Sequence, residues 1–162
     1  MRYVILLLFP ILVHAQTNDL HALKSLEENE QIVIDVKIGG CFDGETDTKI
    51  LITKKGTSYE FIYIENVYQI IAKIDEKLLL YRKKLEQWIN ENTETLAKYG
   101  TRKIITEEQY QSKIKLLQNT IIGFKDCTSR FVGEYSTITI DSKRLQLKES
   151  FSCKVVLNLQ IK

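Results

Sequence analysis

The stretch between residues 74 and 99 constrains the fold most, because it has the pattern of an amphipathic helix while the segments on both sides alternate like strands. Its apolar residues recur mostly at steps of three and four, which places them on one helical face. They are Ile74, Leu78, Tyr81, Leu85, Trp88 and Leu96. Asp75 stands where an N-cap is expected, and Gly100 follows the expected C-terminus. We therefore predict a helix over about 75–98 that needs a sheet to cover its apolar face.

A second helix is predicted over about 107–123. Thr106 and Gln109 have the spacing of a capping box, and acidic residues fill the first turn. The apolar stripe of this helix is Tyr110, Ile114, Leu117 and Ile121. Residues 101–105 are expected to be a short link between the two helices.

Strands are predicted on both sides of the helices. Residues 32–38 alternate apolar and polar side chains, and residues 49–54 and 58–64 form a hairpin around Lys55 and Gly56. After the helices, residues 134–140 alternate weakly, and residues 151–161 alternate most regularly of all. Residues 41–48 are expected to be a polar connection, and residues 67–73 fit either a strand or the first turns of the long helix.

This order of elements predicts an α+β domain. Its mainly antiparallel sheet combines N-terminal strands within 32–64 and C-terminal strands within 134–161, and the two helices cover one face. The length of 162 residues suits one domain over residues 16–162. Within it, residues 16–30 are either a flexible arm or a short helix.

The first fifteen residues have the pattern of a secretory signal peptide. Arg2 precedes an apolar run over 4–13, and Ala15 stands at the expected cleavage site. The run is too short for a membrane span, which needs about 20 residues, so the mature chain is expected not to span a membrane. We predict export to a periplasmic or extracellular location.

The charge balance argues against a nucleic-acid partner. The whole chain carries a formal net charge of +2, and removal of residues 1–15 takes away one basic residue and no acidic one. Such a nearly neutral chain has no overall electrostatic attraction for nucleic acid or for an anionic membrane.

Three cysteines allow one disulfide and leave one cysteine over. In an exported protein, Cys41, Cys127 and Cys153 are disulfide candidates first. Any of three pairings is open. We favour Cys127–Cys153, because the segment between them reads as adjoining strands. Cys41 then stays free, pairs with a partner or is buried.

Few residues offer chemistry. Asp43, Glu45 and Asp47 have the spacing of the first ligands of a calcium loop, but Thr48 and Lys54 occupy positions where that loop needs Gly and Glu. We interpret these acids as a solvated loop. Cys41 is the candidate nucleophile, with His21 as the single histidine of the mature chain. No metal or other cofactor is predicted.

A cluster of tyrosines around the hairpin is the candidate binding surface. Tyr59, Tyr63 and Tyr68 either form an exposed aromatic patch or pack within the sheet, and we favour packing. The preferred function is a small exported binding protein without catalysis, whose partner would be an envelope or extracellular protein. The alternatives are a thiol-dependent enzyme or hydrolase using Cys41, and a structural subunit that oligomerises through helix 75–98.

Overall fold

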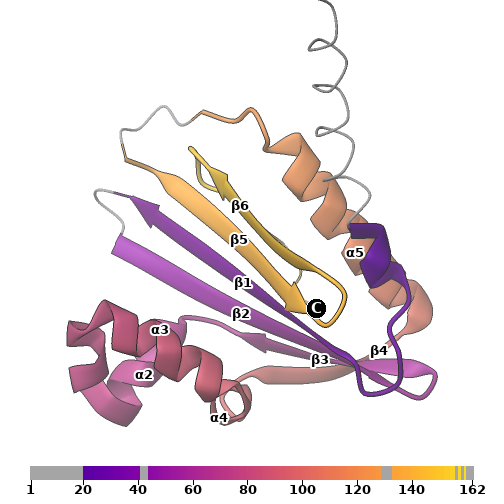
Figure 1. Cartoon of the computed structure of the whole chain (residues 1–162), viewed down its shortest axis with the longest axis horizontal. Helices are drawn as coiled ribbons and strands as arrows, with labels where there is room; N and C mark the ends of the chain where they lie inside the picture. The colour runs from indigo at the N-terminus through magenta and orange to yellow at the C-terminus, as the bar shows by residue number, and fades with distance from the viewer. Residues whose placement is uncertain (1–19, 41–43, 129–132, 156, 158, 160–162) are drawn as a thin grey trace, which may run out of the picture.

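The computed structural model shows a six-stranded antiparallel sheet with helices packed against it (Figure 1). It describes residues 20–40, 44–128, 133–155, 157 and 159, and the predicted signal peptide lies outside them. The strand order is β4-β3-β2-β1-β5-β6. The strands are β1 (Gln31–Gly40), β2 (Gly44–Lys55), β3 (Ser58–Ile64), β4 (Thr101–Thr106), β5 (Tyr135–Ser142) and β6 (Gln146–Phe151). The predicted α+β class, with strands from both ends of the chain in one sheet, is confirmed.

The central strand β1 has the alternation that the sequence predicted. Ile32, Ile34 and Val36 are buried on one face, while Val33, Asp35 and Lys37 point to the other. Ile34 lies opposite Ile50 of β2 and Ile140 of β5, so the aliphatic residues of three strands meet on the same face. The hairpin of β2 and β3 is confirmed, and Gly56 at its turn has a φ of 60° that favours glycine.

Helices cover both faces of the sheet, whereas one face was predicted. Helix α5 (Glu107–Gly123) and the 3-10 helix η1 (Leu20–Lys24) pack on the face of Ile34. The helices α2 (Val67–Asp75), α3 (Arg82–Glu91) and α4 (Thr93–Ala97) pack on the other, against Leu51, Ile62 and Ile64. Figure 1 shows α5 well apart from the group formed by α2, α3 and α4.

The single helix predicted over 75–98 is wrong. Asp75 has an extended conformation and ends α2, and its side chain caps the 3-10 helix η2 (Glu76–Leu80) by accepting from Lys77 N at 3.0 Å. A second break follows at Asn92, which separates α3 from α4. Residues 67–73 are helical, which settles the alternative that the sequence left open.

Helix α5 agrees with its prediction in bounds and in buried face. Thr106 accepts from Gln109 N at 3.3 Å, and Gln109 Oε1 accepts from Thr106 N at 3.0 Å, so the capping box is present. Tyr110 stacks on Tyr59 of β3 with ring centroids 3.9 Å apart. Its hydroxyl donates to the carbonyl of Leu23, which ties η1 to α5.

Two further expectations about strands fail. The link predicted over 101–105 is wrong, because these residues belong to β4, an edge strand that pairs with β3 and buries Ile105. The strand predicted over 151–161 is also wrong, since β6 ends at Phe151 and the described residues after it form only one isolated bridge, at Ser152. Cys153, Val155 and Leu159 are nevertheless buried in the core on the α5 side.

Candidate functional site

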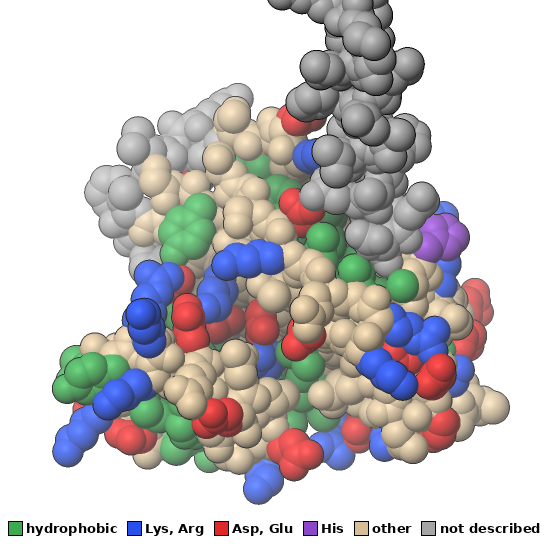
Figure 2. Space-filling model, viewed as in Figure 1, with side chains coloured by type: hydrophobic (Ala, Val, Ile, Leu, Met, Phe, Trp, Pro, Cys, Tyr) green, Lys and Arg blue, Asp and Glu red, His purple; other side chains and the backbone are tan. Residues whose placement is uncertain are grey.

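The face of the sheet under α2, α3 and α4 is apolar at one end and charged at the other. Near β3 it carries Leu51 and Ile62, which the helices cover. Toward β5 the same face carries Asp35 and Lys37 of β1 and Asp47 of β2. Figure 2 shows acidic and basic side chains mixed over this part of the sheet. The helical layer stops before β5 and β6, so a polar surface remains open beside it.

An open groove of about 600 Å³ lies where the helical layer ends. Its sides come from α3 and α4 on one hand and from β5 and β6 on the other, with β1 and β2 between them. The polar residues that line it are Gln31, Asp35, Lys49, Asn90, Thr93, Thr139, Asp141, Gln146 and Lys148. This set provides hydrogen-bond donors, acceptors and both signs of charge.

An ion pair joins β1 to β2 at the bottom of the groove. Lys49 Nζ lies 2.6 Å from Asp35 Oδ1, a contact that is ionic and lacks the angle of a good hydrogen bond. The side chain of Lys49 is only 1% exposed, whereas that of Asp35 is 20% exposed. A buried ammonium requires such a counter-charge, and the antiparallel register provides it by placing Asp35 opposite Lys49.

Asp47 extends this charged network beneath the helices. It lies opposite Lys37 in the β1–β2 ladder and is 2% exposed. Burial, with help from the negative charge of Asp35, raises the pKa of Asp47 to about 6 even though Lys37 and Lys49 oppose the shift. Its Oδ1 has no hydrogen-bond partner among the described residues.

Lys37 connects the sheet to the helices above it. Its ammonium lies 3.6 Å from Glu86 of α3 and also hydrogen bonds to Tyr68 of α2. Burial alone would lower the pKa of Lys37, but Tyr68, Asp47 and Glu86 outweigh it and raise the pKa. Lys37 therefore links both helices to the sheet, in addition to the apolar contacts that they make with Leu51, Ile62 and Ile64.

The predicted acids are not a solvated loop. Asp43 lies outside the described residues, whereas Glu45 and Asp47 belong to β2, and Asp47 is buried. Glu45 accepts from the hydroxyl of Tyr135 at 3.0 Å, and the Tyr135 ring fills the space where Gly39 has no Cβ. Within the described part of the chain, no three His, Cys, Asp or Glu residues are grouped so that they could hold a metal ion.

The candidate tyrosines do not form one surface. Tyr59 is fully buried on the α5 face, where its hydroxyl donates to Glu107 at 2.7 Å. Tyr63 packs partly buried against the same core, while Tyr68 packs on the opposite face. The packing interpretation describes them better than an exposed aromatic patch. Cys41, the candidate nucleophile, lies outside the described residues.

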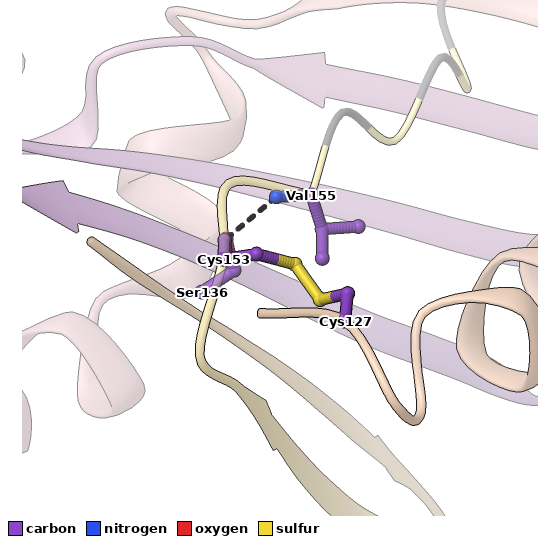
Figure 3. The surroundings of a disulfide bond; sticks show 4 residues. All are labelled: Cys127, Ser136, Cys153 and Val155. Carbon is purple, nitrogen blue, oxygen red and sulfur yellow. Dashed lines mark hydrogen bonds between the residues drawn. A yellow bond between two sulfur atoms is a disulfide. The ribbon is translucent and has the colours of Figure 1, made fainter. Parts of the chain in front are cut away.

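Cys127 and Cys153 form a disulfide, the pairing that the sequence favoured (Figure 3). Their Cα atoms are 6.0 Å apart, and the bond connects the end of α5 to the segment after β6. Beside it, the buried hydroxyl of Ser136 accepts from Val155 N at 2.8 Å and donates to the carbonyl of Cys153 at 2.7 Å. The segment after β6 is thus held by a side chain and a disulfide in place of a strand ladder.

The comparisons with known proteins find no match: no family model, no curated protein and no solved structure resembles the chain. In the part of the chain that the structure describes, no helix is long and apolar enough to cross a membrane.

Sequence reasoning missed the groove. The alternation over 32–38 predicts that Asp35 and Lys37 lie on the polar side of a strand, but it does not predict that a helical layer covers part of that side. The described residues that line the groove include no histidine, cysteine or serine. They offer both signs of charge together with hydroxyl and amide groups for hydrogen bonding.

Proposed function

We propose that the protein is an exported binding protein that holds a small polar ligand in the groove beside α3. The observation that carries the proposal is the groove itself, about 600 Å³ in volume and lined by amides, hydroxyls and both signs of charge. This volume falls in the range of small-molecule sites. Export is supported by the apolar run over 4–13 and by the disulfide, which persists in oxidising compartments.

The charges of the groove favour a zwitterionic ligand such as an amino acid or a short peptide. Asp141 of β5 and Lys148 of β6 lie diagonally across one strand pair, since Thr139 is opposite Lys148 and Asp141 is opposite Gln146. Diagonal neighbours are about 7–8 Å apart. A ligand whose ammonium reaches Asp141 while its carboxylate reaches Lys148 can pair with both at once.

The test is an NMR titration of the labelled protein with a zwitterionic dipeptide, a dicarboxylate and a neutral disaccharide. We expect the dipeptide to shift the amides of β5, β6 and the end of α3. Asp141→Asn and Lys148→Gln should each weaken this binding about tenfold, the equivalent of one charged hydrogen bond. Lys115→Gln, on the exposed face of α5, is the matched control and should bind as the native chain does.

Two results would count against the proposal. One is an absence of shifts at the groove with all three compounds at millimolar concentration. The other is binding that Asp141→Asn and Lys148→Gln leave unchanged.

A further inference from the structure

A second surface of the molecule, separate from the groove, is apolar and exposed. It lies at the corner where α2 passes through η2 into α3, and we call it the η2 corner. Its apolar members are Ile74, Leu79, Leu80 and Tyr81. Leu80 is 76% exposed and Tyr81 is 57% exposed, whereas Ile71 before the corner and Leu85 after it are buried.

The local backbone holds these side chains outward. Asp75 caps η2, and Tyr81 N donates to the carbonyl of Leu78 at 3.2 Å, which closes the turn. Leu78 alone turns inward, where it packs half-buried against the core under α2 and α3. Single exposed apolar residues need no explanation, but four within eight positions at a protruding corner indicate a contact surface.

Lysines surround this apolar tip. Lys73, Lys77, Lys83 and Lys84 are all exposed, and Lys84 Nζ lies 5.0 Å from the centre of the Tyr81 ring. Residues 73–86 contain five basic and three acidic side chains, so this short segment carries as much net positive charge as the whole chain. Figure 2 shows hydrophobic and basic side chains together at the outer end of the α2–α3 layer.

We propose that the η2 corner docks on an anionic bilayer. Leucine and tyrosine side chains enter the boundary between headgroups and acyl chains, and lysines around them reach back to the negative headgroups. Tyrosine is typical of this boundary, because its ring is apolar and its hydroxyl is polar. The rest of the chain is neutral overall, so the small net charge of the whole chain does not reveal that basic residues gather at this corner.

The test places a fluorescent reporter at the corner. Leu80→Trp in a Trp88→Phe background leaves one tryptophan, at a position that is exposed in the free protein. We expect its emission to shift to the blue with vesicles of phosphatidylglycerol and phosphatidylcholine, and to be quenched when the lipid is brominated. Pure phosphatidylcholine should give a response at least about tenfold weaker at equal lipid, because each lysine near an anionic surface adds to the attraction.

Two variants define the surface. Lys83→Glu with Lys84→Glu, added to the reporter, should lower the apparent affinity for anionic vesicles about tenfold or more. Ile122→Trp in the same Trp88→Phe background is the matched control, because Ile122 is an exposed apolar residue of α5 in the other helical layer. All variants have the same N-terminus as the native protein, so any effect of that end on vesicle binding is the same in each of them.

Three outcomes would overturn the proposal. The Leu80→Trp reporter fails to respond to anionic vesicles, or the Ile122→Trp reporter responds equally. In the third, the Leu80→Trp emission shifts with protein concentration in the absence of lipid, which would assign the corner to contact between copies of the chain.

Discussion

At the scale of single residues, buried polar groups mark where this fold is most sensitive. Lys49 and Asp47 are two positions apart on β2, so they point to the same face of the sheet, and both are almost completely buried. The first is neutralised by Asp35, while the second has a carboxyl whose ionisation is disfavoured. The stability of the protein should therefore depend on the protonation of Asp47.

Asp47 makes the protein less stable as the pH rises through about 4 to 6. Its native pKa of about 6 exceeds the 3.8 of an ordinary aspartate, so the native state binds the proton more tightly than the unfolded state. Asp47→Asn removes this titration. The unfolding free energy of Asp47→Asn minus that of the native chain should be about 1–3 kcal/mol more positive at pH 7.5 than at pH 4.

Urea unfolding at the two pH values measures this difference, with Asp126→Asn as the control at an exposed position. A native-minus-variant difference that does not change with pH would show that Asp47 does not titrate in this range.

Gly100 and Gly123 form a matched pair for steric effects. A Cβ on Gly100 would lie 2.6 Å from Ile62 Cγ2 and 3.1 Å from the carbonyl oxygen of Tyr63, whereas a Cβ on Gly123 meets no atom within 4 Å. Gly100→Ala should therefore destabilise the protein by about 1–3 kcal/mol. Gly123→Ala, at the end of α5, should stabilise it by up to about 1 kcal/mol. Chemical denaturation measures both, and equal effects would refute the steric explanation.

At the scale of elements, the segment after β6 shows how far a sequence pattern can be trusted. The alternation of Cys153, Val155 and Leu159 correctly predicts which side chains are buried. It fails to predict the hydrogen bonding, because Ser136 replaces a neighbouring strand as the partner of the backbone. Alternation reports which side chains face the core and does not report how the backbone is paired.

Ser136→Ala tests this arrangement. It leaves Val155 N and the carbonyl of Cys153 without their buried partner, so we expect a loss of about 1–3 kcal/mol and faster hydrogen exchange at the Val155 amide. Ser150→Ala, on the exposed side of β6, should change the stability by less than about 0.5 kcal/mol. Unchanged exchange at Val155 in Ser136→Ala would mean that another group holds the segment.

The helices also differ in how well the sequence pattern predicts them. Helix α5 could be predicted to the residue, because its capping box and its apolar stripe agree. The long helix could not, because Ile74 and Tyr81 fit a stripe yet are exposed in the structure. The side chain of Asp75 offers the backbone an alternative to continuing the helix, and periodicity alone does not reveal when that alternative wins.

At the scale of the whole molecule, the sheet could be predicted but its second helical layer could not. The hairpin of β2 and β3 and the return of the C-terminal strands follow from alternation and turn residues. The groove joins residues of α3, β1 and β6, whose proximity depends on how the helices sit on the sheet. The groove also depends on the burial of charged residues such as Lys49. Lysine is rarely buried in proteins, so the sequence does not predict this burial.

The strand order has a consequence for how the chain is made. β1 is synthesised before the other five strands, yet it lies between β2 and β5, and β5 begins only at Tyr135. A growing chain can pair one side of β1 at once and must leave the other side open for about 90 further residues. During that interval the exposed backbone of β1 can accept a strand from another chain, so a chaperone that shields nascent chains should raise the yield.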